Sequence, residues 1–258
     1  MSSRVFLAAK WEYLVMLNYE VDPEILKPHL PPFTEIDYFD GKALVSVVGF
    51  LFNETKVLGI KWPGLTNFEE VNLRFYVKHF DGEKWKRGVA FISEIVPKPL
   101  IALVANTIYN EHYSVAKMKH TLVQTSEAID ISYEWKRRNE NWNSMSVSAL
   151  PHLKIIEAGS EEEFIFEHYL GYNKLNTSTS IEYTVEHPRW QIYPVINTNL
   201  KADIQKLYGE EFVPFIYEKL PRSVFLARGS DVRVRTLKKI RTGFADVISR
   251  DDISGDDI

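Results

Sequence analysis

Residues 68–77, Phe-Glu-Glu-Val-Asn-Leu-Arg-Phe-Tyr-Val, alternate apolar and chemically active side chains from Glu70 onward. On a β-strand, successive side chains point to opposite faces. One face would carry Val71, Leu73, Phe75 and Val77, and the other Glu70, Asn72, Arg74 and Tyr76. A strand with one solvated face alternates in the same way. A carboxylate, an amide, a guanidinium and a phenol in succession are more typical of a hydrogen-bonded set, so we interpret this face as the wall of a pocket.

Glu70 and Arg74 are spaced so that they can bracket a small molecule. On one strand face they lie about 13 Å apart, which is too far for a direct ion pair. Arg74 would bind a carboxylate or phosphate group, and Glu70 would accept hydrogen bonds, act as a base or pair with a cation from elsewhere. The competing hypothesis is an ion-pair network that only stabilises the interior, and the sequence leaves both open.

Lys117 is the candidate nucleophile. It follows an apolar segment, residues 100–109, that predicts a buried helix, and on a strand from residue 113 to residue 120 it would share a face with Tyr113 and Lys119. A lysine in an apolar site beside a second cation has a lowered pKa and can form a Schiff base with a carbonyl compound. Because lysine is almost never fully buried, two exposed lysines are the competing interpretation.

Other reaction types lack their motifs. The chain has no glycine-rich phosphate loop, no nucleophile elbow and no His-Glu-x-x-His. It has no cysteine, which excludes disulfides, thiolate nucleophiles and cysteine-ligated zinc. Each histidine is more typical of a satisfied core or surface residue than of a ligand. The seven are His29, His79, His112, His120, His152, His168 and His187. We therefore expect no metal and no nucleotide or flavin cofactor.

The composition is that of a globular protein. Of 258 residues, 45% are hydrophobic and 26% charged, which excludes a disordered or membrane class for the bulk of the chain. The net charge of −4 and the lack of a long basic run disfavour nucleic-acid and anionic-membrane partners. The N-terminal apolar run is too short for a signal peptide, and no window approaches a transmembrane span. We expect a cytoplasmic protein.

The pattern of elements predicts an α+β fold dominated by antiparallel strands. Helices are expected at residues 23–29, 100–109, 161–169 and 199–208. Strands are expected at residues 11–20, 34–39, 42–52, 68–77, 88–96, 113–120, 122–124, 128–137, 144–149, 178–186 and 190–195, with a final hairpin of 223–226 and 231–237. No repeat or linker divides the chain, so we expect one domain over residues 1–240 and a disordered acidic tail over residues 241–258.

The order of motifs resembles the uncharacterised YqjF-like family of the acetoacetate decarboxylase-like superfamily. The resemblance covers residues 10–240, and its most specific parts are the 68–77 strand and His187-Pro188-x-Trp190. Supporting motifs are Leu26-x-x-x-Leu30-Pro31, the segment 36–48 around Asp40-Gly41, Gly88-Val89-x-Phe91, Phe166-x-x-x-Tyr169 and Val232-x-Val234.

The resemblance implies a strongly curved antiparallel sheet that closes into a cone-like barrel around a central cavity, with a few flanking helices. In acetoacetate decarboxylases, a lysine shortly after the buried helix forms an imine with a β-keto acid, and glutamates bind and orient the substrate. The matching stretch here is residues 110–113, Asn-Glu-His-Tyr, which has no lysine; Lys117 lies a few residues later, and Glu70 matches one active-site glutamate.

We therefore expect a barrel that binds a small organic acid. Candidate catalytic residues are Lys117 and Glu70. Candidate substrate-binding residues are Arg74, Asn72, Tyr76, His112, Tyr113, His187 and Trp190. One alternative is a Schiff-base lyase or decarboxylase that acts on an oxo acid through Lys117. Another is a structural or oligomer-forming protein without a ligand, and the resemblance also favours a homo-oligomer.

Overall fold

The computed structural model describes residues 4–241 and consists mostly of β-strands. The first half of the chain contains β1 (Val5–Val21), a 3-10 helix (Pro23–His29), β2 (Glu35–Ile36), β3 (Ala43–Val57), β4 (Phe68–Phe80), β5 (Trp85–Val96), α1 (Pro99–Ile108), β6 (Tyr113–Val115), β7 (Lys117–Gln124) and β8 (Ile129–Lys136).

The second half of the described chain has shorter elements between longer strands. They are β9 (Asn143–Ala149), β10 (Lys154–Ile155), α2 (Glu161–Phe166), β11 (Leu170–Asn176), β12 (Thr179–Glu186), β13 (Gln191–Tyr193), β14 (Val195–Lys201), α3 (Ile204–Tyr208), a 3-10 turn (Glu210–Phe212), α4 (Val213–Ile216), β15 (Ser223–Arg235) and β16 (Lys238–Arg241).

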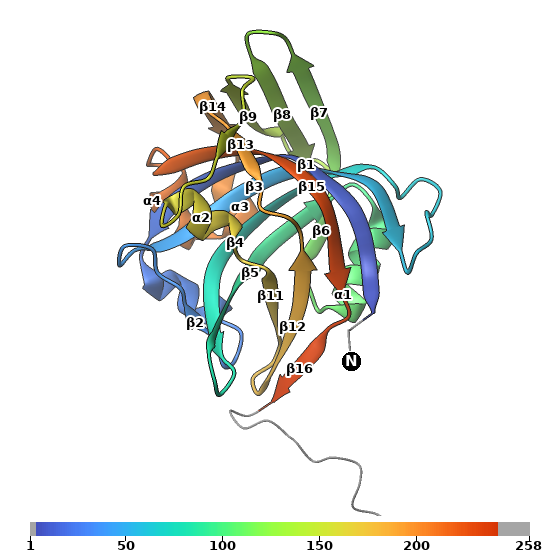
Figure 1. The fold of residues 1–258 in the computed structure, drawn as a ribbon, viewed down its shortest axis with the longest axis vertical. Coiled ribbons are helices and arrows are strands. Elements are labelled where there is room, and N and C mark those ends of the chain that lie inside the picture. Colours follow the sequence, from blue (N-terminus) through green and yellow to red (C-terminus); the bar gives the residue numbers. More distant parts are fainter. Residues whose placement is uncertain (1–3, 242–258) are drawn as a thin grey trace, which may run out of the picture.

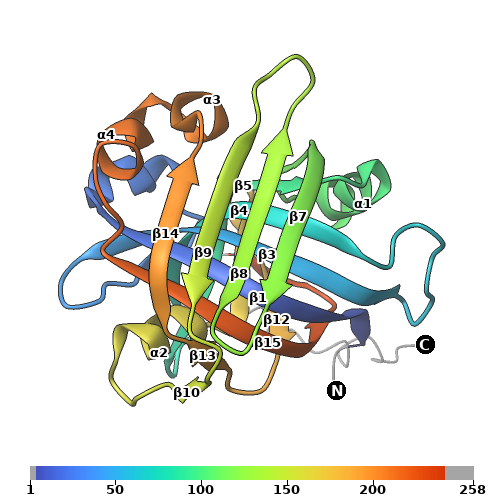
Figure 2. The same ribbon diagram turned by 90° about the horizontal axis from the view of Figure 1, so that it is seen from above.

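The strands form two sheets. The larger has the order β10-β13-β15-β1-β3-β4-β5-β11-β12-β16. Because β12 also pairs with β15, the strands from β15 to β12 in this order form a ring of paired strands. Most of these pairs are antiparallel, whereas β5 pairs with β6 and β11 in parallel. The smaller sheet has the order β14-β9-β8-β7. It lies across β1 and β3, with α3 and α4 on one side of it and α1 on the other (Figure 1, Figure 2).

Irregular pairing bends the long strands. The register between β1 and β3 shifts between Ala8 and Lys10 and again between Glu12 and Val15, and Tyr13 has a φ of 52°. Such bulges bend a strand and increase its twist. The neighbouring strand β15 accommodates the bend at Gly229, where φ is 85° and a Cβ atom would lie 1.9 Å from the carbonyl oxygen of Trp11. Only glycine fits there.

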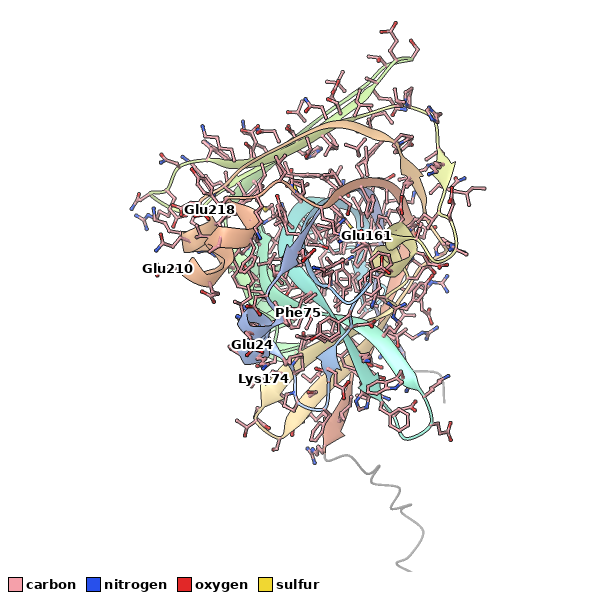
Figure 3. The ribbon with its side chains drawn as sticks, turned by 90° about the vertical axis from the view of Figure 1, so that its left-hand side faces the viewer. Glu24, Phe75, Glu161, Lys174, Glu210 and Glu218 are labelled. Atoms are coloured by element: carbon pink, nitrogen blue, oxygen red, sulfur yellow. The ribbon has the colours of Figure 1, made fainter. Side chains whose placement is uncertain are left out.

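The two faces of β4 have different neighbours, as the alternation predicts. Its apolar face packs in the core between the two sheets, against residues of β8 and β9 such as Tyr133 and Met145. Phe75 belongs to this core and lies inside the molecule, whereas Glu24, Lys174, Glu210 and Glu218 lie at its edge (Figure 3). The other face of β4 points toward the inside of the larger sheet.

Local end signals are confirmed at several elements. Asp22 accepts a hydrogen bond from the Glu24 amide at the start of the 3-10 helix. The Ser160 hydroxyl accepts a hydrogen bond from the Glu163 amide at the start of α2, and the Glu163 carboxylate accepts one from the Gly159 amide. The Asp40-Gly41 turn has positive φ at both residues, as a primed turn requires.

Four predictions about elements are wrong. Residues 223–235 form one strand and not a hairpin, because Gly229 allows β15 to continue past the bend in β1. The expected helix 161–169 ends at Phe166, and the strand β11 that follows was not predicted. Lys201 ends a strand in a segment that we expected to be helical. The strand expected at residues 113–120 is broken at Ala116 into β6 and β7, which belong to different sheets.

A fifth correction concerns the burial of α1. We expected it to be buried, but Leu100, Leu103 and Ile108 are 49%, 62% and 44% exposed, and Ala102 is its buried residue. One face of α1 packs on the larger sheet, and the opposite face of the helix is exposed to solvent. The acidic tail predicted from residue 241 lies, apart from Arg241, outside the described residues. Within residues 4–241, none of the helices combines the length and the apolar character that crossing a membrane requires.

Candidate functional site

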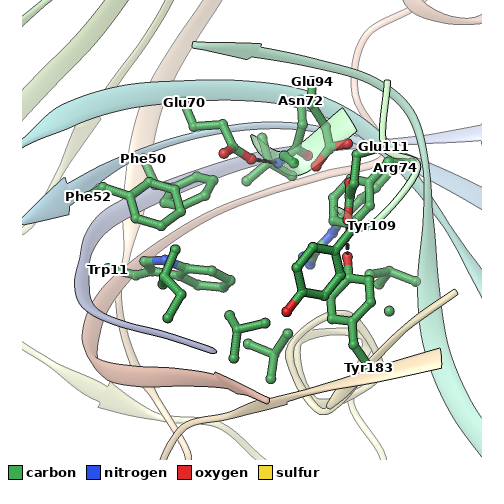
Figure 4. Close-up of a pocket in the computed structure, with 18 of the residues that line it drawn as sticks. Trp11, Phe50, Phe52, Glu70, Asn72, Arg74, Glu94, Tyr109, Glu111 and Tyr183 are labelled. Atoms are coloured by element: carbon green, nitrogen blue, oxygen red, sulfur yellow. Dashed lines mark hydrogen bonds between the residues drawn. The ribbon is translucent and has the colours of Figure 1, made fainter. Parts of the chain in front are cut away.

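A cavity lies inside the larger sheet, against the polar face of β4 (Figure 4). Its volume is about 130 Å³, measured as the space open to the centre of a water molecule. One buried water occupies roughly 10–15 Å³ by this measure, so the cavity has room for a small organic molecule. One side is aromatic and comprises Trp11, Phe50, Phe52, Phe68 and Trp190, whose rings are joined by mutual contacts. The other side carries most of the polar groups.

Glu70 is held by two neutral hydrogen-bond donors. Its Oε1 accepts a bond of 2.9 Å from Nδ2 of Asn72, and its Oε2 accepts one of 2.8 Å from the hydroxyl of Tyr113. The side chain is buried, with 3% of the residue exposed. Burial raises the pKa of Glu70 to about 7, although the two hydrogen bonds act in the opposite direction. Glu70 therefore changes its charge near neutral pH.

Glu94 and Glu111 form a pair of acids beside Glu70. Glu94 is 2% exposed, and the negative charge of Glu111 acts on its carboxyl group. Burial, followed by the charge of Glu111, raises the pKa of Glu94 well above its usual range. No cation is paired with either carboxylate among the residues that the structure describes. Because its pKa is raised, Glu94 keeps a proton more readily than an ordinary glutamate and so needs no counter-ion when protonated.

One carboxylate oxygen of Glu111, Oε1, is positioned by β11 and β12. Its Oε1 accepts a hydrogen bond of 2.7 Å from the hydroxyl of Tyr183. Tyr183 pairs with Gly171, and a Cβ atom on Gly171 would lie 2.1 Å from Cζ of the tyrosine ring. The missing side chain thus lets the ring cross β11 and reach the cavity.

Arg74 is the cation in the cavity wall. Its Nη2 donates a hydrogen bond of 3.2 Å to the carbonyl oxygen of Ile165 in α2 and contacts Sδ of Met16 at 3.6 Å. Its Nε is buried without a partner, and no carboxylate of residues 4–241 forms an ion pair with it. Because Glu70 and Glu94 are protonated more readily than ordinary carboxylates, the charge of Arg74 is not cancelled by its neighbours.

His168 also lines the cavity, between α2 and β11. Its Nε2 lies 3.2 Å from Oδ2 of Asp37, which also accepts a hydrogen bond of 2.5 Å from Nε of Arg87. Its Nδ1 is buried and has no hydrogen-bond partner. Burial lowers the pKa of His168, and the neighbouring arginines add to this effect, while Asp37 opposes it.

The structure brings together six of the residues expected from the sequence. Glu70, Asn72, Arg74, Tyr113, His187 and Trp190 all line the cavity. The His187 ring stacks on the Trp190 ring at 4.0 Å, and Nε1 of Trp190 donates a hydrogen bond to Ser230. The His-Pro-x-Trp motif therefore forms one aromatic wall.

Three expected residues lie elsewhere. Tyr76 is behind the wall, because α2 covers this end of the β4 face: its ring contacts Phe164 at 5.1 Å and its hydroxyl bonds to Ser46. His112 is exposed, since it lies between two residues, Glu111 and Tyr113, that point into the cavity. Lys117 is exposed on β7, where it pairs with Lys136 in the smaller sheet. The interruption between β6 and β7 at Ala116 separates Lys117 from the cavity.

Sequence reasoning missed Glu94, Glu111 and His168. Glu94 lies in a strand that we predicted, and its apolar neighbours Ile92, Ile95 and Val96 are a signal that it is buried. Glu111 lies in the segment 110–113, which the sequence marks only by its lack of a lysine. His168 is one of seven scattered histidines, and nothing near it in the sequence indicates Asp37, which is 131 residues away.

The arrangement combines a guanidinium without a carboxylate partner among residues 4–241, carboxyl groups with raised pKa values and a buried imidazole in one partly apolar cavity. It can hold an anionic group at Arg74 and can donate or accept protons at the acids and at His168. Among residues 4–241 no group of three or more His, Cys, Asp or Glu side chains is arranged to hold a metal ion.

Comparisons with known proteins agree with this fold. The family model DUF2071, described as "Uncharacterized conserved protein", matches residues 8–231. The uncharacterized protein YqjF of Bacillus subtilis (strain 168) is 28% identical over 213 residues, which cover 80% of this chain and 84% of that protein.

Two solved structures are similar in fold. The acetoacetate decarboxylase from Legionella pneumophila has a TM-score of 0.60 and 14% identity and covers 93% of this chain and 89% of its own. The enduracididine biosynthesis enzyme MppR complexed with pyruvate has a TM-score of 0.63 and 12% identity and covers 93% and 91%. The chain has the acetoacetate decarboxylase-like fold, and it belongs to the DUF2071 family of uncharacterized, YqjF-like proteins.

Proposed function

We propose that this protein binds a small organic acid in its cavity and that Arg74 holds the carboxylate of the ligand. The main support for the proposal is that the Arg74 guanidinium lacks a partner for its charge among residues 4–241. It lies in the cavity wall without a carboxylate partner among the described residues, and its Nε is buried without an acceptor. A buried donor without a partner is costly, and a bound carboxylate would satisfy it with a charge-assisted hydrogen bond.

The remainder of the cavity fits the non-polar part of such a ligand. Its aromatic side provides apolar contact area, and its volume of about 130 Å³ matches a molecule of a few carbon atoms. The pyruvate complex of MppR supports the choice of ligand, because that protein of similar fold binds a small oxo acid.

Schiff-base chemistry is the less favoured alternative. It needs an amine in the cavity, but the residues of 4–241 that line it include no lysine. A purely structural role is also less favoured, since a structural network would pair the Arg74 charge internally. We also propose a cytoplasmic location, as the composition indicates, and a cone-like closure of the larger sheet and a homo-oligomer, as the resemblance implies.

Calorimetric titration and thermal-shift measurements with acetate, pyruvate, 2-oxobutyrate and acetoacetate test the proposal. We expect at least one of these acids to bind the wild type. Arg74→Met should weaken binding about 10- to 100-fold, since a hydrogen bond to a charged group contributes roughly 1.5–3 kcal/mol. Arg138→Met is the matched control, because Arg138 is exposed at the turn between β8 and β9. Equal affinity in both variants, or no binding to the wild type, would refute the proposal.

A further inference from the structure

Two cavity residues with unpartnered polar atoms, Arg74 and His168, are near neighbours. Both contact the ring of Tyr76: Cζ of Arg74 lies 5.6 Å from its centroid, and the His168 ring lies 4.9 Å from it. Arg74 also donates a hydrogen bond to Ile165, three residues before His168. An anion at Arg74 would therefore lie close to the imidazole.

The contacts of His168 determine which nitrogen carries its proton. Burial acts to raise the pKa of Asp37, but the hydrogen bonds from His168 and Arg87 outweigh it, so the pKa is lowered and the carboxylate is ionised. An ionised carboxylate only accepts hydrogen bonds, so Nε2 of His168 must be the donor. In the neutral ring, Nδ1 then carries the lone pair.

The imidazole is also kept neutral and rigid. Burial, which leaves 1% of the side chain exposed, lowers the pKa of His168. The rings of Tyr76 and Phe164 pack against it at 4.9 and 5.0 Å. A neutral imidazole with a free Nδ1, oriented by a carboxylate on the other nitrogen, is the arrangement that a general base requires.

A purely structural histidine explains these contacts less well. A buried nitrogen without a partner costs about 1–3 kcal/mol, and most buried polar groups in folded proteins are paired. His168 is part of the cavity lining, so the cavity lies next to the residue whose buried Nδ1 lacks a partner.

We propose that His168 is a general base that removes a proton from C3 of a 2-oxo acid held at Arg74, and that Asp37 is its positioning residue. This inference rests on the proposed organic-acid binding. In the step, the C3–H bond breaks, the proton moves to Nδ1, and the electron pair forms the C2=C3 bond while the negative charge moves to the C2 oxygen. Return of a proton from Nδ1 restores the oxo acid, so no oxidant or co-reactant is needed.

The test is exchange of the C3 hydrogens of 2-oxobutyrate with deuterated solvent, followed by proton NMR. We expect the wild type to accelerate exchange above the buffer rate, and His168→Gln to lower the acceleration about 100-fold or more while binding is retained, in line with the usual contribution of a general base. His152→Gln is the matched control, because His152 is exposed and outside the cavity lining. Exchange that is absent, or equal in His168→Gln, with binding intact would overturn this inference and leave the proposed binding function in place.

Two further measurements separate catalysis from a structural role. Nitrogen-15 NMR of the histidine-labelled wild type should show His168 protonated at Nε2 and bare at Nδ1, and the Nδ1 signal should move when 2-oxobutyrate is added; a proton on Nδ1 would overturn the inference without any variant. Asp37→Asn should shift the acidic limb of the exchange–pH profile to lower pH, because the carboxylate supports the charged imidazole. An unchanged profile would contradict the role of Asp37.

Discussion

Glu94 of β5 and Glu111, from the segment between α1 and β6, meet inside the cavity, and neither carboxyl group has an ion-pair partner among residues 4–241 (Figure 4). The negative charge of Glu111 and burial both disfavour the charged form of Glu94, so Glu94 retains a proton more readily than a free glutamate. The cavity thereby becomes less negative than its composition indicates, which is a condition for binding an anion beside it.

The acid pair should make stability depend on pH. The pKa of Glu94 is raised in the folded protein, so above about pH 4.5 the unfolded chain releases a proton that the folded protein keeps. The free energy of unfolding should therefore fall as pH rises from 5 to 8, by at most about 1.4 kcal/mol per pH unit from this group. Glu94→Gln should flatten that slope and be more stable than the wild type at pH 8.

Urea unfolding at pH 5, 6, 7 and 8 measures this slope. Glu127→Gln, at an exposed turn of the smaller sheet, is the matched control and should keep the wild-type slope. Parallel profiles for Glu94→Gln and the wild type would show that Glu94 releases its proton at the ordinary pH.

Tyr113→Phe should raise the pKa of Glu70 above its value of about 7. The tyrosine hydroxyl donates a hydrogen bond of 2.8 Å to Glu70 and favours its charged form, so its removal leaves the neutral form preferred. Carbon-13 NMR titration of glutamate side chains, with Glu70→Gln to assign the signal, measures the change. A lower or unaltered pKa would mean that this hydrogen bond does not control Glu70.

Gly171→Ala should displace Tyr183 from Glu111. The added methyl group would lie 2.1 Å from the tyrosine ring, and overpacking of this kind costs about 1–3 kcal/mol. In a Tyr183→Ala background the same change should cost little, because the obstructing ring is absent. Unfolding free energies of the four proteins in this cycle test the contact, and additive effects would argue against it.

Borohydride reduction in the presence of pyruvate, 2-oxobutyrate or acetoacetate should leave Lys117 unmodified. The lysine is exposed on β7 and lies outside the cavity lining, so it has the accessibility but not the apolar surroundings of an imine-forming residue. Peptide mass mapping provides the readout. A stable adduct at Lys117 above the level at other exposed lysines would restore the Schiff-base hypothesis.

The sequence by itself determined the features that depend on neighbouring residues. The two faces of β4 follow from the two-residue period of a strand, and so the placement of Glu70, Asn72 and Arg74 on one side was predictable. The helix starts at Asp22 and Ser160 and the turn at Asp40-Gly41 rest on hydrogen bonds and φ angles within a few residues.

The tertiary structure alone decided which distant segments meet. The break at Ala116 removes Lys117 from the cavity, yet no residue near Ala116 marks the point where the chain leaves one sheet for the other. Likewise Asp37 and His168, 131 residues apart, become partners only when α2 packs over the end of β4. Such pairings depend on contacts between segments that are far apart in the sequence, so the local periodicity of the chain cannot indicate them.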